Sequence, residues 1–144
     1  MNEEKMIDKL KGTLAFDTSV LIELVFSTSR GNKIKHLLEA NQIDAHVTDL
    51  SICELAYILC RKIGWTEGKV RVENLKGSNY LAITPIGDLI PSASKYKCRR
   101  AISLADCFCL SLSKKLDCPA LFVRERELEK EMAKNEFDVK IILI

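Results

Sequence analysis

The stretch "LAFDTSVLIEL", residues 14–24, decides the fold, because a single acidic residue in it separates a strand from a helix. The letters "TLAF" before Asp17 are short and apolar, which is typical of a strand buried on both faces of a parallel sheet. The segment "TSVLIELVFS" (18–27) predicts a helix that Thr18 or Ser19 could cap. Asp17 therefore lies at the edge of the core. An isolated buried carboxylate is very costly, so Asp17 must be solvated, paired or bound to a cation.

The same alternation of strand and helix continues along the chain. Short apolar runs rich in strand formers predict strands, and amphipathic periodic segments between them predict helices. This order indicates a three-layer α/β/α fold with a mostly parallel central sheet. The predicted strands are 13–16, 43–48, 80–86, 119–123 and 139–144. The predicted helices are 18–27, 30–41, 49–64, 66–78, the part of 87–100 after Pro91, 101–116 and 125–134.

Length and composition predict one globular domain, residues 1–144, in which 1–12 form a polar N-terminal extension. The chain is 47% hydrophobic and 29% charged, which argues against disorder. Its net charge of +2 is only a weak indication of an anionic partner. No apolar run approaches the length needed to cross a membrane, and the start "MNEEKMIDKLKG" has no signal-peptide core. We therefore expect a cytoplasmic protein with no membrane contact.

The six cysteines form no CxxC pair, and the two histidines, His36 and His46, lie far from them in sequence. This spacing argues against a structural zinc site. Free cysteine in an apolar segment behaves as a small hydrophobic residue. We therefore interpret the cysteines as reduced core residues.

Several further acidic residues lie at the ends of predicted strands or on predicted helices. Each alone has an ordinary explanation, such as an ion pair between Asp106 and an arginine, or a helix N-terminus for Glu125 and Glu127. Together with Asp17 and Glu54 they could converge on one pocket, where two like charges ~4 Å apart repel by about 4 kcal/mol at an effective dielectric of 20. A cation would hold such a cluster together, and hard oxygen ligands favour Mg²⁺ or Mn²⁺.

Four segments resemble, in order, the motifs of PIN-domain ribonucleases: "LAFDTSVLIEL", "VTDLSICELAYIL", "ISLADCFCLSLSKKL" and "PALFVRERELE". They span residues 13–129. The resemblance implies that Asp17, Glu54, Asp106 and Glu125 are the catalytic, metal-binding acids. The family usually has an Asp after a Thr at the fourth position. This chain instead has Val123 and Glu125, with Glu127 as a possible substitute.

The resemblance also implies supporting residues and a function. Ser19 matches the family's hydroxyl and would orient a carboxylate or a metal-bound water, while Thr48 and Ser51 would support Glu54. The single-domain size resembles VapC-type toxins. The function implied is a Mg²⁺- or Mn²⁺-dependent endoribonuclease, the toxin of a toxin–antitoxin pair, with RNA as substrate and a small antitoxin protein as partner.

An RNA substrate needs cationic contacts away from the metal, and a basic run precedes the Asp106 helix. Phosphate neutralisation by such residues gives salt-dependent binding that is largely independent of sequence. Tyr96 lies within the run and could stack on a base, whereas we expect Trp65 and Tyr80 to pack in the core. The predicted RNA-binding residues are Lys95, Lys97, Arg99 and Arg100.

Two alternative functions and one assembly prediction stand beside the nuclease. A catalytically degenerate PIN module would bind RNA or a protein partner without cleaving it. A phosphatase or receiver-type fold would phosphorylate Asp17, but Ser19 stands where haloacid-type phosphatases have a second Asp. The early helices have more apolar residues than one sheet face needs, which predicts a homodimer. These residues are Val20, Leu21, Leu24, Val25, Phe26, Leu37 and Leu38.

Overall fold

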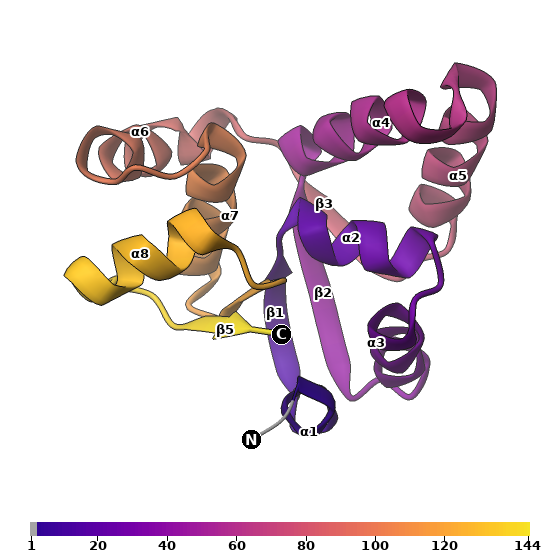
Figure 1. Cartoon of the computed structure of the whole chain (residues 1–144), viewed down its shortest axis with the longest axis horizontal. Coiled ribbons are helices and arrows are strands. Elements are labelled where there is room, and N and C mark those ends of the chain that lie inside the picture. The colour runs from indigo at the N-terminus through magenta and orange to yellow at the C-terminus, as the bar shows by residue number, and fades with distance from the viewer. Residues whose placement is uncertain (1–2) are drawn as a thin grey trace.

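The computed structural model describes residues 3–144 and, among their side chains, those from Lys5 onward. Five strands form one sheet in the order β3-β2-β1-β4-β5, and every neighbouring pair is parallel (Figure 1). The strands are β1 (Gly12–Phe16), β2 (Ile43–Thr48), β3 (Leu81–Thr84), β4 (Ala120–Phe122) and β5 (Ile141–Leu143). The predicted α/β/α class is confirmed, and the sheet is entirely parallel.

Helices cover both faces of this sheet, as Figure 1 shows. On one face lie α1 (Glu3–Asp8), α2 (Thr18–Val25), α3 (Ser29–Glu39), α4 (Asp49–Ile63) and α5 (Trp65–Gly77). On the other lie the short 3-10 turn η1 (Gly87–Leu89), α6 (Ile90–Arg99), α7 (Leu104–Leu116) and α8 (Arg126–Lys134). Of the extension predicted at 1–12, residues 1–2 lie outside the described part of the chain, and most of the rest forms α1.

The central strand β1 shows why its sequence has no alternation of polar and apolar residues. Leu14 and Phe16 pack into the cluster under α1 to α5, whereas Ala15 packs into the cluster under α6 to α8. All three side chains are buried. A strand between two helical layers must be apolar on both faces, which explains the unbroken run before Asp17.

Two glycines allow turns that position the helices on the first face. Gly64 adopts φ 86° between α4 and α5, a left-handed conformation that favours glycine. Gly31 lies in α3 where that helix meets the end of α2, and a Cβ there would be 2.0 Å from the backbone oxygen of Glu23. The α2–α3 corner therefore requires glycine at position 31.

Some sequence-based expectations about burial are wrong. Trp65 begins α5 with 61% of its surface exposed, because it follows the Gly64 turn and points away from the core. Cys53 and Cys98 are exposed, so the expectation of core cysteines is wrong for these two. Cys107 and Cys109 are buried, and Cys118 packs partly against the core. No helix among the described residues is long and apolar enough to span a membrane.

The apolar residues behind the homodimer prediction lie largely inside the single chain. Val20, Leu21 and Leu38 are buried in the core, and the other four pack partly against it. These helices therefore bury most of that apolar surface within the domain, and the homodimer stays a prediction.

Candidate metal centre

Asp17 alone connects β1 to α2, since β1 ends at Phe16 and α2 begins at Thr18. Asp17 caps α2, and its Oδ2 accepts a hydrogen bond from the Ser19 N–H at 3.0 Å. The residue is only 4% exposed, and its other oxygen, Oδ1, has no hydrogen-bond partner. One carboxylate oxygen is thus held by the helix start and the other is available to a ligand.

Asp106 approaches from the opposite helical layer. Ser103 caps α7, and its hydroxyl accepts a hydrogen bond from the Asp106 N–H at 3.1 Å. Like Asp17, Asp106 is 4% exposed and has one oxygen, Oδ2, without a partner. Ser103 was not among the residues predicted from the sequence, although a Ser three residues before an acid is a recognisable helix start.

Burial and mutual repulsion raise the pKa values of both aspartates. For Asp17, burial raises the pKa most, hydrogen bonds from Ser19 oppose the rise, and the charge of Glu54 adds to it. For Asp106, burial and then the charges of Asp17 and Glu125 raise the pKa to about 8. A protonated Asp106 can donate to Asp17, but two ionised carboxylates leave Asp17 Oδ1 and Asp106 Oδ2 unpartnered. The pair therefore favours either a shared proton or a cation.

Glu54 and Glu125 lie around this pair and are half-buried. Burial raises the pKa of Glu125, and the charges of Asp17, Glu127 and Glu54 raise it further. Glu125 immediately precedes α8 and its side chain does not cap that helix. Glu127 is exposed in the first turn of α8 and interacts with Glu125. The structure thus brings the four predicted acids close enough to repel one another, with Glu127 at their margin.

The predicted supporting residues act on backbone positions. The Ser19 hydroxyl accepts a hydrogen bond from the Val123 N–H at 3.0 Å, which ties the end of β4 to the turn that carries Asp17. Thr48 caps α4, its Oγ1 accepting from the Ser51 N–H at 3.1 Å. Both residues are buried, and they position the first turn of the helix that carries Glu54. Among the described residues neither bonds to the Glu54 carboxylate.

The donor set suits a hard divalent cation, although the side chains are not closed around one. No group of three or more His, Cys, Asp or Glu residues in the described part of the chain is arranged to hold a metal ion as it stands. The two unpartnered aspartate oxygens are the ligands that Mg²⁺ and Mn²⁺ prefer. A cation on these oxygens would remove the repulsion between two buried charges. Asp17 and Asp106 therefore fit such an ion, and Glu54 or Glu125 would have to turn toward it.

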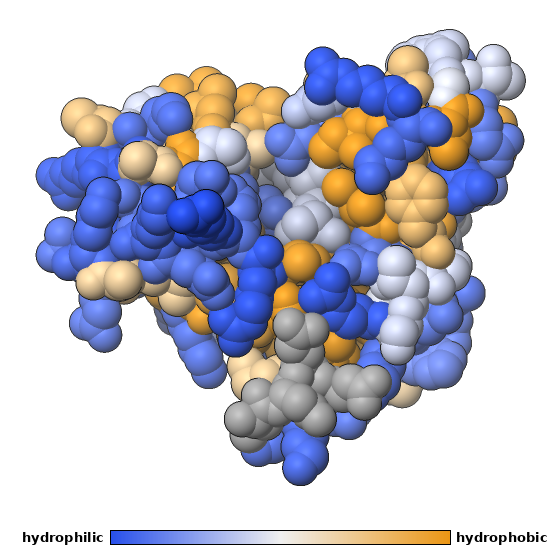
Figure 2. Space-filling model, viewed as in Figure 1, coloured by the Kyte–Doolittle hydropathy of each residue, from blue (hydrophilic) through white to orange (hydrophobic). Residues whose placement is uncertain are grey.

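These acids gather at the carboxyl ends of parallel strands, where open α/β sheets usually bind ligands. Asp17 follows β1, the Glu54 helix follows β2, and Glu125 lies shortly after β4. In Figure 1 these strand ends lie between α6 and α4. Figure 2 shows the surface hollowed between the side of α6 and α8 and the side of α4 and α5.

The predicted RNA-binding cations have different environments. Arg100 donates to three backbone oxygens at the end of α8 and beyond it, at 2.7 to 3.0 Å. Its guanidinium lies 3.8 Å from the centre of the Phe137 ring. Lys97 donates to the Ile102 oxygen at 2.7 Å. Within the described residues no hydrogen bond or ion pair engages the side chains of Lys95 and Arg99.

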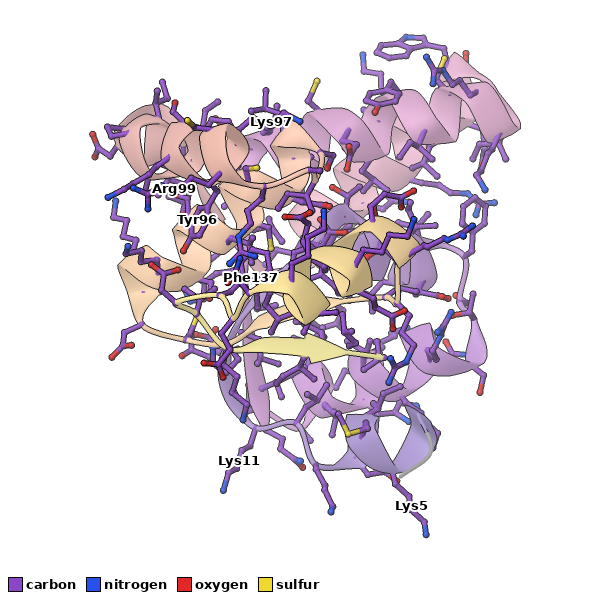
Figure 3. The ribbon with its side chains drawn as sticks, turned by 60° about the vertical axis from the view of Figure 1, so that its left-hand side comes forward. Lys5, Lys11, Tyr96, Lys97, Arg99 and Phe137 are labelled. Atoms are coloured by element: carbon purple, nitrogen blue, oxygen red, sulfur yellow. The ribbon has the colours of Figure 1, made fainter. Side chains whose placement is uncertain are left out.

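A hollow of about 210 Å³ lies beside this basic run, with Lys95 and Arg99 in its lining. Tyr96 also lines it, but its hydroxyl donates to Asp138. Its ring lies near Phe137, as Figure 3 shows. Burial and then Asp138 raise the pKa of Tyr96. Tyr96 and Arg100 therefore hold the segment after α8 against α6. Lys95 and Arg99 line the hollow together with Glu136 and Asp138.

The chain matches one protein family and is similar in fold to several solved structures. The family model described as the PIN domain matches residues 14–132. No protein of curated function matches the chain. The structural neighbours share the fold of this chain at low sequence identity.

The chain is similar to VapBC2 from Rickettsia felis, solved with a DNA fragment from the promoter, at TM-score 0.68 and 9% identity over 92% of this chain and 98% of that one. It is similar to DNA-bound VapBC from Salmonella typhimurium at TM-score 0.67 and 14% identity, over 93% and 98%. It is also similar to VapC20 from Mycobacterium tuberculosis, a sarcin–ricin-loop-cleaving toxin, at TM-score 0.65 and 18% identity, over 89% and 98%.

Proposed function

Because this chain belongs to the PIN-domain family, we propose that it is a Mg²⁺- or Mn²⁺-dependent endoribonuclease and the toxin of a toxin–antitoxin pair. The observation that carries the proposal is the pair of buried aspartates, Asp17 and Asp106, each with one unpartnered carboxylate oxygen. Structural ion pairs rarely leave such oxygens unsatisfied, because an unpaired buried polar group is costly.

Each residue then has a defined role. Asp17 and Asp106 hold the cation, and Ser19 keeps Asp17 in position through its backbone N–H. Glu54 and Glu125 add negative charge on either side of the pair. When bound, the cation supplies an activated water and stabilises the charge that develops in phosphodiester hydrolysis.

Lys95 and Arg99 bind RNA phosphates away from the metal, because both are exposed and without an internal partner in the described structure. Such contacts add affinity and fix the position of the strand without reading its sequence. Lys97 and Arg100 contribute less to RNA binding, because the side chains of both already donate hydrogen bonds to backbone oxygens of the protein.

The partner proposals rest on the neighbours. The VapBC complexes from Rickettsia felis and Salmonella typhimurium contain both proteins of a pair, which supports a small antitoxin for this chain. A small DNA-binding protein encoded directly upstream would be the first candidate. A homodimer remains part of the proposal.

Cleavage of an RNA pool by the purified protein, with Mn²⁺ and with EDTA, tests the proposal. Wild type should cleave only with metal, and Asp17→Asn should abolish cleavage while the far-UV circular dichroism spectrum stays unchanged. Asp88→Asn is a matched control, because the side chain of Asp88 is 92% exposed and lies outside the acidic cluster. Cleavage by Asp17→Asn at the wild-type rate would refute the metal site.

A second candidate function is a degenerate PIN module that binds RNA or a protein without cleaving it. Two observations favour it: no three acids in the described residues are arranged around an ion, and Val123 and Glu125 depart from the family's Thr and Asp. Tight RNA binding with no cleavage under any divalent metal would establish this alternative. Membership of the PIN family leaves no support for the phosphatase or receiver-type alternative.

A further inference from the structure

The strand β5 is one edge of the sheet, because the strand order ends with it. Its residues pair in register with β4, from Ala120 opposite Ile141 to Phe122 opposite Leu143. The backbone oxygen of Lys140 accepts a hydrogen bond from the Ala120 N–H. The Ile144 N–H donates to the backbone oxygen of Phe122, and the Ile144 oxygen accepts from the Arg124 N–H. Backbone groups alternate in direction along a strand. Those of Ile141 and Leu143 therefore face away from β4.

Among the described residues no further strand pairs with this outer edge, because β5 ends the strand order. An open edge is a template on which another extended chain can pair. Strand addition of this kind gains affinity from the backbone and specificity from pockets for alternate side chains. β5 is short, so a partner would also need side-chain contacts beside the strand.

A groove beside β5 supplies such contacts. This β5 groove has a volume of about 580 Å³ and runs between α1, β5 and α8. Apolar side chains line part of it, including Leu10, Leu14, Met132 and Ile142. Ile142 packs against the core cluster on one face of the sheet, while Ile141 and Leu143 pack against the other. Apolar residues of an added strand could therefore follow the edge of the sheet into this groove.

The polar lining of the β5 groove is entirely cationic. It comprises Lys9, Lys11, Lys140 and Arg124, of which Arg124 donates to Glu129 at 2.6 Å. The three lysine side chains are exposed and make no hydrogen bond or ion pair within the described residues. Lys11 points out into solvent in Figure 3. This arrangement attracts negative charge to the edge of β5.

The lysines of the β5 groove favour one kind of binding partner over others. Pairing of β5 with β5 of a second copy would bring two sets of lysines together, and like charges juxtaposed at an interface are unfavourable. Nucleic acid would be attracted by the lysines but could not use the free strand edge in the same way. A peptide with alternating acidic and apolar residues satisfies the backbone, the apolar lining and the lysines together.

We propose that the outer edge of β5 and the β5 groove form a docking surface for an extended acidic segment of a partner protein, which adds to the sheet as a sixth strand. The surface is separate from the acidic centre. None of the four acids lines the β5 groove, although Glu125 follows Arg124 in the sequence. The proposal is independent of whether the protein cleaves RNA.

The probe is a fluorescein-labelled octapeptide of alternating valine and glutamate, titrated with the full chain at low salt by fluorescence anisotropy. Its matched control is the same peptide with N-methyl groups on alternate residues, which blocks strand pairing and preserves charge. We expect saturable binding of the first peptide and at least tenfold weaker binding of the second. Equal binding of both peptides, or of neither, would overturn the proposal.

Two variants separate the strand edge from charge alone. Leu143→Pro removes an outward-facing N–H that β4 does not use, and edge strands tolerate proline at such positions. Lys9→Glu with Lys140→Glu should weaken binding about tenfold, as expected when two surface ion pairs become repulsive contacts. Lys69→Glu with Lys76→Glu on α5 is the matched charge control and should bind as wild type does.

The outcomes that contradict the proposal are specific. If Leu143→Pro fails to fold, the lysine variants and the N-methylated peptide still decide the result. Dimerisation that Leu143→Pro abolishes would assign the edge to a second copy instead. If Lys9→Glu with Lys140→Glu weakens binding of an RNA pool but not of the peptide, the surface is a nucleic-acid contact and the proposal is wrong.

Discussion

Replacing Asp106 by Asn is expected to stabilise the metal-free protein at neutral pH, although it should abolish cleavage. Asp106 is 4% exposed, and burial followed by the charges of Asp17 and Glu125 raises its pKa to about 8. On folding, Asp106 therefore either takes up a proton or remains ionised beside the charges of Asp17 and Glu125. Asparagine is neutral and nearly isosteric, and its amide N–H can donate to Asp17.

The magnitude follows from the difference between the pKa values in the folded and unfolded states. A carboxyl whose folded-state pKa is raised above 3.8 makes the protein most stable below about pH 4, and the stability falls as the pH rises toward 8. Between these limits each pH unit costs about 1.4 kcal/mol, so the cost at pH 7 is at most about 4 kcal/mol. With relaxation of the site, Asp106→Asn should gain about 1–4 kcal/mol, or roughly 3–12 °C in melting temperature at about 3 °C for each kcal/mol.

Thermal unfolding in EDTA at pH 4 and pH 7.5 measures this effect. Asp106→Asn should melt above wild type at pH 7.5 and close to it at pH 4. Asp88→Asn, with its side chain 92% exposed, is the matched control and should not change the melting temperature at either pH. Mn²⁺ should stabilise wild type more than Asp106→Asn, because the variant lacks one metal ligand.

Two results would refute the reasoning. A melting temperature for Asp106→Asn equal to or below wild type at pH 7.5 would mean that the buried acids do not repel one another. A gain of the same size at pH 4 and pH 7.5 would mean that the effect comes from packing or hydrogen bonding and not from charge.

Three further predictions test the fourth acid, the basic run and the assembly. Glu125→Asp should keep or raise the rate of Mn²⁺-dependent cleavage and Glu125→Gln should lower it; equal rates in both would remove Glu125 from the site. Lys95→Ala with Arg99→Ala should weaken RNA binding and reduce its salt dependence by about one unit of slope for each phosphate that is no longer neutralised. Arg100→Ala should instead lower stability by about 1–3 kcal/mol, because it leaves backbone oxygens after α8 unpaired. These roles would be contradicted if Arg100→Ala weakened RNA binding without loss of stability while Lys95→Ala with Arg99→Ala only destabilised the fold. Light scattering at micromolar concentration should give the mass of a dimer, and a strictly monomeric mass would contradict it.

The sequence by itself determined the elements and their class. Strand and helix follow from local periodicity, so the helix after Asp17 and the strands at 43–48 and 119–123 were predicted within a few residues of α2, β2 and β4. Alternation of apolar strands with helices also determined the three layers, because both faces of such a sheet must be covered. Asp17, Glu54 and Asp106 were found because each lies among apolar residues, and Glu125 because it follows the strand at 119–123.

Only the tertiary structure decided what those side chains meet. The raised pKa of Asp106 depends on Asp17 and Glu125, which come from two other elements of the fold. The four cations of the basic run look alike in sequence. Arg100 nevertheless donates hydrogen bonds to backbone oxygens at the end of α8 and after it, whereas Lys95 does not. Trp65 is exposed for the same reason, since its surroundings depend on the Gly64 turn. Local sequence sets backbone conformation, but burial and charge at a side chain are set by the neighbours that folding brings to it.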